Sequence, residues 1–505
     1  MKILTTQQTR EADAYTIEHE PISSIELMER ASMVFVDWFI EQFPLADHDM
    51  VSVICGKGNN GGDGLAIARL LHGHGYDVGV FVLNFLESST SDFETNLERI
   101  QSIEDDQLTF KLIESVDDMP VFDADEIIID AILGSGLSRS LDGDLAAVIE
   151  FLNESNNTTV AVDIPTGVLA DDHTMGACLQ VQYTCTFEYP KLAFLLPENF
   201  CHVGNFVHLP IGLHHQYLEE VQTPYYYITS DIIRTIYKPR DKFAHKGVFG
   251  HALLVAGSFG KLGAAILATK ACLRTGVGLV TVHVPSCGYE VMQTTVPEAM
   301  VSLDEDERIF TRVYDLPKYT TIAMGCGLST KNKTRNALCY VLKNTDTPTV
   351  LDADALNILG QSPDWFEYIP KGSILTPHPK EFERMFGKPN NNFERLQLQR
   401  LKAQELGVYI ILKGANTCIA TPDGTCFFNS TGNPGMGTAG SGDVLTGILS
   451  SLLAQHYSPL DACILGVYIH GLAGDIAALD NSEESLTAGD IVDYLGQAFL
   501  EVKDY

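Results

Sequence analysis

Short apolar runs alternate along the chain with longer segments whose apolar residues recur at helical spacing. Residues 51–55, Val-Ser-Val-Ile-Cys, form one apolar run of the kind typical of a buried strand. Residues 24–42 instead place Leu27, Ala31 and Phe35 on one face of a helix. Because such strands and helices alternate, the pattern predicts parallel sheets with helices on both faces and ligands at the carboxyl ends of the strands.

This plan of strand, turn and helix occurs in two halves. In the first half, the pattern predicts helices over 7–18 and 65–74 and strands over 78–83, 126–129 and 158–162. In the second half, it predicts a helix over 263–276, a strand over 279–284, and strand ends at 324–327, 351–357, 375–379 and 410–417. A connector within residues 215–245 separates the halves, so we expect domains at 1–220 and 230–505. The predicted fold class is α/β, with two three-layer α/β/α domains.

Composition narrows the class of protein and its partners. A chain of 505 residues that is 45% hydrophobic and contains 42 glycines suits an α/β enzyme with two to four full cores. The net charge of −33 argues against nucleic acid and anionic membranes as partners. Phosphate ligands would therefore have to be bound by local features, such as glycine-rich backbone, helix ends and a few placed cations.

Cysteine usage and hydropathy indicate where the protein works. The eleven cysteines never occur as Cys-x-x-Cys, which argues against a zinc site and a disulfide framework. No apolar run is expected to reach the length of a membrane span, and the first residues lack the apolar stretch of a signal peptide. These features favour a cytoplasmic location.

The segment from Gly432 to Asp443 is the strongest indication of chemistry. It holds five glycines in twelve residues and leads directly into an apolar helical segment. Backbone N–H groups and the helix N-terminus would form an anion pocket, and Asp443 lies in the first helical turn. A carboxylate beside bound phosphates can accept the proton of an attacking hydroxyl, so the segment predicts phosphoryl transfer rather than an ordinary glycine-rich turn.

Two further residues of the second half fit a phosphate-binding site. Lys413 ends an apolar run, where its cation would meet phosphates, and the turn Gly414–Thr417 follows it. His378 stands between two prolines, which favours orientation of a substrate over metal binding. Asp352 and Asp354 precede a helix start, and N-capping would explain at least one of them.

The first half contains a second glycine-rich turn, at 56–64. It is neither the dinucleotide fingerprint nor a Walker A loop, yet it suits a phosphate or pyrophosphate. Asp130 and Asp163 each end a strand and could face one pocket, although such aspartates are more often caps or turn formers. Asn60, Asp130 and Thr166 offer only oxygen ligands, which suit a hard cation such as K⁺ or Mg²⁺.

Together these motifs resemble two known families joined in one chain. The first half resembles the NAD(P)H-hydrate epimerase family through residues 27–31, 58–64, 130–134 and 163–167. The second half resembles the ADP-dependent NAD(P)H-hydrate dehydratases of the ribokinase-like group through 246–247, 257–258, 352–357, 376–379, 412–414 and 432–443. The resemblance implies a Rossmann-like N-terminal domain, a ribokinase-like C-terminal domain and a bifunctional repair enzyme.

The epimerase resemblance implies interconversion of the R and S forms of hydrated NADH and NADPH. Asp163 would contact the substrate and serve as acid or base, and Asn60, Asp130 and Thr166 would bind K⁺. The other implied substrate-binding residues are Asn59, Asn60, Gly61, Gly62, Asp63, Gly134, Ser135, Gly136, Leu137, Ser138, Arg139 and Ser140.

The dehydratase resemblance implies removal of water from the S form at the expense of ADP, giving AMP and phosphate. Asp443 would assist attack of the 6-hydroxyl on the β-phosphate, with Mg²⁺ as counter-ion. The implied hydrate-binding residues are Ala264, Gly327, His378 and Asp443. The implied nucleotide-binding residues are Lys413, Gly414, Ala415, Asn416, Thr417 and Gly442.

Three positions depart from the usual family residues. Thr166 stands in place of serine, Cys326 in place of the proline of a Gly-Pro-Gly turn, and Asn416 in place of glycine. The alternative function is a ribokinase-like small-molecule kinase with a non-catalytic N-terminal binding domain, although a kinase would not need the epimerase-like half. We expect a homo-oligomer acting on small molecules.

Overall fold

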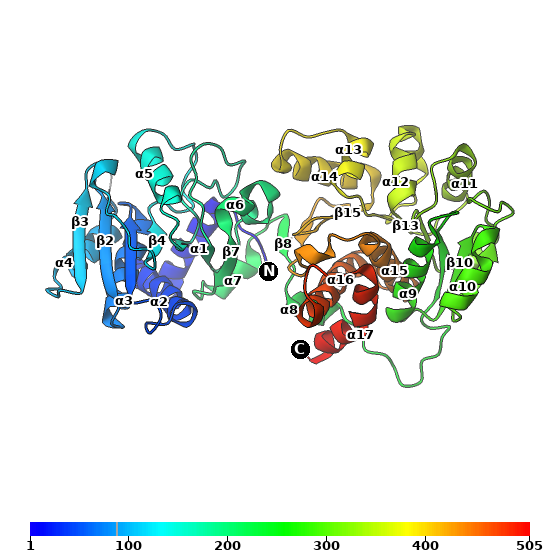
Figure 1. The fold of residues 1–505 in the computed structure, drawn as a ribbon, viewed down its shortest axis with the longest axis horizontal. Coiled ribbons are helices and arrows are strands. Elements are labelled where there is room, and N and C mark those ends of the chain that lie inside the picture. The colour runs from blue at the N-terminus through cyan, green and yellow to red at the C-terminus, as the bar shows by residue number, and fades with distance from the viewer. Residues whose placement is uncertain (87–88, 505) are drawn as a thin grey trace. The chain divides into compact units, whose positions relative to one another are not determined.

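The computed structural model describes residues 1–86 and 89–504. It divides into two compact units: Lys2–Thr223 forms the N-terminal unit, and Pro224–Tyr505 together with Met1 forms the C-terminal unit. Figure 1 shows that each unit, taken by itself, is a sheet covered by helices. The predicted α/β class is confirmed, because the strands of both sheets are largely parallel and alternate with helices.

Seven parallel strands form the sheet of the N-terminal unit, in the order β3-β2-β1-β4-β5-β6-β7. The strands are β1 (Met50–Cys55), β2 (Asp77–Leu83), β3 (Leu108–Ile113), β4 (Ile127–Ala131), β5 (Thr159–Val162), β6 (Tyr183–Phe187) and β7 (Asn205–Leu209). This is the doubly wound order of a Rossmann-like fold, and it reverses between β1 and β4, where ligands bind at the carboxyl ends. The four strands predicted here lie within two residues of β1, β2, β4 and β5.

Helices cover both faces of this sheet. They are α1 (Thr6–His19), α2 (Ser24–Gln42), α3 (Asn59–Gly73), α4 (Ser91–Gln101), α5 (Gly143–Glu154), α6 (Phe200–Val203) and α7 (His215–Glu220). Phe35 and Phe39 of α2 pack with Leu65 of α3 in one core cluster. Val148 and Leu152 of α5 belong to a separate cluster that includes other residues of the same strands. Three layers result, as predicted.

The first turns of α3 differ from the prediction. The glycine-rich turn was expected to be a loop with a helix beginning at Leu65, but the helix begins at Asn59. A Cβ atom on Gly61 would lie 2.0 Å from the carbonyl oxygen of Gly56, and one on Gly64 would lie 2.4 Å from Cβ of Ala131. The glycines therefore let the helix start pass close to the strand ends, and this packing outweighs their low helix propensity.

Ten strands form the sheet of the C-terminal unit, in the order β11-β10-β9-β12-β13-β14-β15-β16-β17-β8. They are β8 (Tyr225–Tyr227), β9 (His251–Val255), β10 (Leu279–Val284), β11 (Met300–Leu303), β12 (Thr321–Met324), β13 (Thr349–Leu351), β14 (Ile374–Leu375), β15 (Tyr409–Leu412), β16 (Cys418–Ala420) and β17 (Cys426–Phe428). The pairs from β11 to β15 are parallel, and β16 is antiparallel to both its neighbours. The order reverses between β9 and β12.

The helices of this unit complete its layers. They are α8 (Ser230–Ile236), α9 (Leu262–Arg274), α10 (Tyr289–Thr295), α11 (Asn332–Lys343), α12 (Ala353–Gly360), α13 (Pro379–Phe386), α14 (Asn392–Leu406), α15 (Ser441–Ala454), α16 (Pro459–Asn481) and α17 (Ala488–Asp504). The predicted helix over 263–276 and strand over 279–284 are α9 and β10. The apolar segment after Asp443 is α15.

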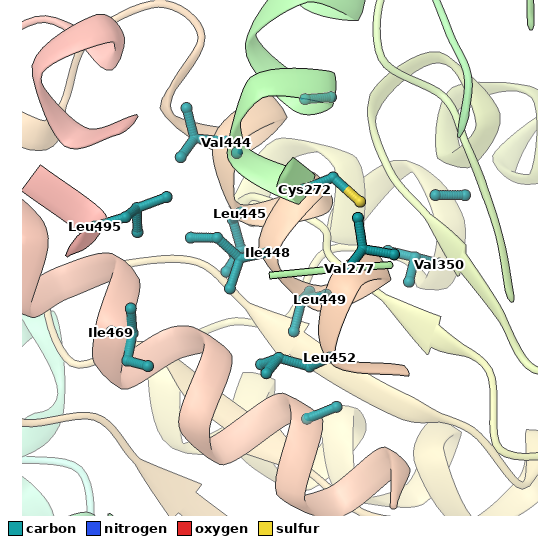
Figure 2. Close-up of a cluster of buried hydrophobic side chains, with 14 of the residues drawn as sticks. Cys272, Val277, Val350, Val444, Leu445, Ile448, Leu449, Leu452, Ile469 and Leu495 are labelled. Carbon is teal, nitrogen blue, oxygen red and sulfur yellow. The ribbon is translucent and has the colours of Figure 1, made fainter. Parts of the chain in front are cut away.

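Helix α15 lies at the centre of the core of the C-terminal unit. Figure 2 shows Val444, Ile448 and Leu452 of this helix among side chains from its neighbours. These neighbours include Ile469 of α16 and Leu495 of α17, and all five side chains are buried. The burial explains why the segment after the glycine-rich loop is mostly apolar.

Helix α16 corrects the expectation about apolar runs. Its 23 residues are long and apolar enough to cross a membrane by length and composition, with a mean hydropathy of 1.6. Within the unit, however, 67% of that apolar stretch is buried, and residues such as Leu465 and Ile469 belong to the core cluster. The composition of this helix resembles that of a membrane span because the helix packs against protein on most of its surface.

The contact between α9 and α15 generates a prediction for stability. A Cβ atom on Gly447 would lie 2.2 Å from the carbonyl oxygen of Ala268, so we expect Gly447→Ala to destabilise the unit by about 1–3 kcal/mol. Gly496, in the exposed part of α17, meets no atom within 4 Å, so Gly496→Ala should stabilise it by about 0.5–1 kcal/mol. Urea unfolding in a Trp38→Phe background, followed by the fluorescence of Trp365, measures both. Equal effects of the two substitutions would contradict the packing argument.

Candidate active sites

A cavity of about 510 Å³ lies at the carboxyl ends of β1, β4 and β5. Eight of the predicted substrate-binding residues line it: Asn59, Asn60, Asp63, Gly134, Ser135, Gly136, Leu137 and Asp163. The other five do not. Gly61 and Gly62 are buried in α3, whereas Ser138, Arg139 and Ser140 are exposed beyond the cavity. The cavity is thus the place where the predicted epimerase residues converge.

Asp163 follows β5 and enters this cavity in a strained backbone conformation. Its φ angle is +66°, which a residue other than glycine adopts only when the surrounding structure holds it. Its Oδ1 atom accepts a hydrogen bond of 2.8 Å from Nζ of Lys191 and one of 3.2 Å from the backbone N–H of Phe187. Only 5% of the Lys191 side chain and 15% of the Asp163 side chain are exposed. The carboxylate is therefore held in one place beside a buried cation.

Two more carboxyl groups line the same cavity. Burial, followed by the charge of Asp163, raises the pKa of Asp13 to about 6, against the opposing effect of Lys191. Burial raises the pKa of Asp63 well above its usual range, and the charges of Asp163 and Asp13 add to this. Three carboxyl groups thus line one cavity and Lys191 forms its ion pair with Asp163, so a carboxylic acid is available near neutral pH.

Sequence reasoning did not identify Asp13 or Lys191. Asp13 lies within α1, and the sequence pattern predicted only a helix for this segment. Lys191 follows the end of β6, a strand absent from the prediction. A prediction of β6 would have placed Lys191 just beyond the sheet edge where Asp130 and Asp163 end their strands.

Two of the three predicted cation ligands, Asp130 and Thr166, are hydrogen-bonded to each other. Asp130 is fully buried, and its Oδ1 and Oδ2 atoms accept hydrogen bonds of 2.7 Å from Oγ1 and 2.8 Å from N of Thr166. Burial raises its pKa to about 6, against the hydrogen bonds from Thr166. Among the residues that the structure describes, Asp130 has no ion pair and the buried Nδ2 of Asn60 has no hydrogen-bond partner. A buried carboxylate that has neighbouring oxygen ligands and no counter-ion fits a hard cation.

In the C-terminal unit, a lysine and an aspartate meet at the ends of β15 and β13. Nζ of Lys413 lies 2.9 Å from Oδ1 of Asp352, and Oγ1 of Thr446 donates to Oδ2 at 3.0 Å. Burial opposes the charge of Lys413, but the Asp352 carboxylate outweighs it and raises the pKa of the lysine. Lys413 is therefore a fixed cation.

Asp443 lies in the first turn of α15, close to this pair. Burial raises its pKa to about 6, a hydrogen bond from Cys326 opposes this, and Asp352 raises it further. The missing side chain of Gly442 leaves room beside the pair, since a Cβ atom there would lie 3.2 Å from Nζ of Lys413. The glycine-rich segment thus brings a carboxylate, a cation and a helix N-terminus together, as the sequence predicted.

N-capping does not explain the two aspartates of α12. Asp352 occupies the N-cap position, but its side chain makes no capping hydrogen bond and instead contacts Lys413 and Thr446. Asp354 accepts hydrogen bonds from N of Ser329 at 2.8 Å and from Nζ of Lys261 at 3.2 Å. Both carboxylates make their contacts around the site, so the interpretation of their side chains as N-caps is wrong.

The other predicted residues of this site differ in their roles. Gly327 and Ala264 are neighbours, since a Cβ atom on Gly327 would lie 3.2 Å from Cβ of Ala264. Nδ1 of His378 accepts hydrogen bonds from the first backbone N–H groups of α13, so this histidine also caps a helix. Its side chain is 44% exposed, and Lys413 and Asp352 are among the charges that act on it.

The turn that follows Lys413 is closed by the side chain of Thr417. Oγ1 of Thr417 donates to the carbonyl oxygen of Gly414 at 2.9 Å. Gly414 and Ala415 are exposed, whereas Asn416 is half-buried. The turn therefore presents backbone groups to solvent beside the lysine.

Comparison with known proteins relates both units to one family. The model for NAD(P)H-hydrate dehydratase matches residues 252–497, and the model for the YjeF-related protein N-terminus matches residues 24–193. The bifunctional NAD(P)H-hydrate repair enzyme Nnr of Moorella thermoacetica is 36% identical over 98% of this chain and 96% of its own length. The enzyme of the same name from Coxiella burnetii is 32% identical over 97% of both chains.

Among solved structures, the ADP/ATP-dependent NAD(P)H-hydrate dehydratase of Bacillus subtilis, co-crystallised with ATP/Mg²⁺, is 32% identical. It covers 54% of this chain and 97% of its own, with a TM-score of 0.49. The classification rests on the relatives that match nearly the whole length of this chain. The chain belongs to the family of bifunctional NAD(P)H-hydrate repair enzymes.

Proposed function

We propose that the chain repairs hydrated NADH and NADPH in two steps. The N-terminal domain, residues 1–220, interconverts the R and S forms, and the C-terminal domain, residues 230–505, dehydrates the S form with ADP. The observation that carries the proposal is that each sheet of this one chain has a carboxylate-lined site where its strand order reverses. The full-length similarity to bifunctional repair enzymes supports the same pairing of activities.

For the epimerase, the cavity offers both an acid and a base. The hydrated ring carries its hydroxyl on C6, next to the ring nitrogen. A protonated Asp13 or Asp63 would give its proton to this hydroxyl, which leaves as water, and the nitrogen lone pair would stabilise the planar cation. Asp163, held by Lys191, would then take a proton from a water that adds to the opposite face. The atoms balance, and only the configuration at C6 changes.

We propose that K⁺ is held by Asn60, Asp130 and Thr166. The buried carboxylate of Asp130 fits such an ion, and the side-chain oxygen of Asn60 offers a further oxygen ligand. Bound there, K⁺ would supply positive charge next to the cavity. Thr166 itself holds the turn at Leu133, because the backbone N–H of Leu133 donates to Oγ1 of Thr166 at 3.1 Å. The next residue, Gly134, lines the cavity.

The cation proposal predicts the behaviour of Asp130→Asn. This change removes the buried negative charge, so the stimulation of epimerisation by K⁺ over tetramethylammonium should be lost. The exposed Asp125→Asn is the control and should keep the stimulation. Initial rates of R-to-S conversion in the two salts measure the effect. A K⁺ response in Asp130→Asn equal to that of the unaltered protein would contradict this cation site.

The acid–base proposal predicts the behaviour of Asp163→Asn. The amide keeps the shape of the side chain but cannot accept a proton, so epimerisation should slow by roughly 10²- to 10⁴-fold. Following the two epimers by chromatography measures this, again with Asp125→Asn as control. If Asp163→Asn equilibrates the epimers as fast as the unaltered protein, Asp163 is not the acid–base group.

For the dehydratase, Asp443 would accept the proton of the C6 hydroxyl as its oxygen attacks the β-phosphorus of ADP. The bond from β-phosphorus to the bridging oxygen breaks and AMP leaves. The ring then loses inorganic phosphate from C6 and a proton from C5, which restores the nicotinamide double bond. Lys413, Gly442 and the turn 414–417 would bind the nucleotide, which enters as its Mg²⁺ complex. Ala264, Gly327 and His378 would face the hydrate.

The role of Asp443 predicts both a substitution effect and a pH dependence. Asp443→Asn should lower ADP-dependent NADH formation by roughly 10²- to 10⁴-fold. The raised pKa of about 6 means that the base is protonated below this pH, so kcat/KM should fall as pH drops below about 6. Absorbance of the restored nicotinamide measures both, with the exposed Asp364→Asn as control. A stable phosphorylated product without NADH would favour the kinase alternative instead.

Three expectations from the sequence stay predictions: the homo-oligomer, the cytoplasmic location and the exclusion of nucleic acid. The preference for ADP over ATP is likewise a proposal. Turnover at saturating ADP, compared with saturating ATP, decides it.

A further inference from the structure

Helix α16 is the wall against which the glycine-rich segment Gly432–Asp443 lies. A Cβ atom on Gly474 of this helix would lie 2.4 Å from Sδ of Met436, and one on Gly471 would lie 2.3 Å from Oγ1 of Thr431. The two glycines therefore let the segment approach the helix closely. This close approach brings polar side chains of α16 within reach of both ends of the segment.

Asp475 of α16 uses both its carboxylate oxygens to hold the start of this segment. Oδ2 accepts a hydrogen bond of 2.8 Å from N of Gly432, and Oδ1 accepts one of 2.9 Å from Nδ2 of Asn433. Oδ1 of Asn433 in turn accepts one of 3.1 Å from N of Gly435. Hydrogen bonds to an ionised carboxylate are stronger than those between neutral groups, so this contact fixes the backbone where the segment begins.

His470, on the same helix, holds the other end of the segment. Its Nε2 atom lies 3.0 Å from the carbonyl oxygen of Ser441, the first residue of α15. Because a carbonyl oxygen can only accept, Nε2 carries the proton and donates it. Burial lowers the pKa of His470 to about 4, against this hydrogen bond, so the imidazole is neutral. One helix thus anchors the segment at both of its ends.

The anchored segment ends in two free backbone donors. Within the described part of the chain, the N–H groups of Gly442 and Asp443 donate no hydrogen bond. Both lie in the first turn of α15, where such groups point at an anion. Gly440, which precedes the helix, has a φ angle of +98°, so the direction of the donors depends on how the segment before them is held.

We propose that Asp475 is a positioning residue of the dehydratase site, whose carboxylate clamps Gly432 and Asn433 so that the segment presents the N–H groups of Gly442 and Asp443 to the phosphates of ADP. The proposal rests on the proposed function of the C-terminal domain. Asp475 acts through the segment and takes no part in the bond changes.

The pairing of a carboxylate with an amide allows a reciprocal exchange as the test. In Asp475→Asn, one amide oxygen faces two donors, so either Gly432 or Asn433 loses its acceptor. In Asn433→Asp, two carboxylates face each other. The double variant Asn433→Asp/Asp475→Asn restores every bond, because the amide at position 475 accepts from N of Gly432 and donates to the carboxylate at position 433. That carboxylate still accepts from N of Gly435.

We expect each single substitution in the full chain to raise the Kd of ADP, measured by calorimetry, by roughly 5- to 20-fold, because ADP must then order the segment as it binds. The double variant should bind ADP nearly as tightly as the unaltered protein. The KM for the hydrate, most of whose proposed contacts lie outside the segment, should be unchanged. Asp480→Asn, at an exposed position of the same helix, is the control and should bind ADP normally.

The outcomes separate this proposal from the proposed function. An unchanged Kd in Asp475→Asn, or a double variant that binds ADP no better than the single variants, would overturn the clamp. An equal rise in the KM for the hydrate would indicate a general loss of structure and would also contradict it. If Asp475→Asn does not fold, Asn433→Ala removes the same hydrogen bond from the segment, and an unchanged Kd there would overturn the proposal. Unaltered protein that binds ADP without dehydrating the hydrate would overturn the function, and the Kd values would still decide the clamp.

Discussion

Close backbone contact at the carboxyl ends of the parallel strands is the constraint on which both sites depend. In the N-terminal unit, a Cβ atom on Gly61 would lie 2.0 Å from the carbonyl oxygen of Gly56. In the C-terminal unit, a Cβ atom on Gly325 would lie 1.7 Å from the carbonyl oxygen of Asp352. A side chain at either position would separate the elements that carry the functional groups. Glycine at these points lets Asn60 and Asp352 reach their sites.

The second requirement is that the sites bury carboxyl groups in a protein of net charge −33. Burial favours the neutral form, so each carboxyl group needs a local partner to stay ionised. Lys191 forms an ion pair with Asp163, and Lys413 forms one with Asp352. Asp13 and Asp63 lack such a dedicated cation, and their raised pKa values follow from that arrangement. Pairing thus separates acids from bases within one cavity.

The two activities complement each other chemically. Hydration of the nicotinamide gives both configurations at C6, and a dehydratase that accepts one of them leaves the other behind. An epimerase in the same chain converts the rejected form into the accepted one. Neither site needs a basic surface, because the phosphates of the substrates can be bound by backbone N–H groups and by single buried cations. This accounts for phosphate chemistry in a strongly acidic protein.

Much of each candidate site could be predicted from the sequence, because the motifs are local. Asp163, Lys413 and Asp443 each stand at the end of an apolar run or the start of a helix, and such positions are visible in the pattern. Asp13 and Lys191 were missed, since neither neighbours a glycine-rich turn and the strand before Lys191 was not predicted. Asp352 was found but misinterpreted, because its partner Lys413 lies 61 residues away.

By itself, the sequence determined the α/β class, about half of the described strands and the residues at their ends, because local periodicity and turn chemistry decide these. Only the tertiary structure decided which side chains meet. The order of the strands places residues 13, 63, 163 and 191 around one cavity, and no local pattern contains that order. It also decided that residues 59–64 form the start of a helix, since packing against β1 and β4 overrides the weak helix propensity of glycine.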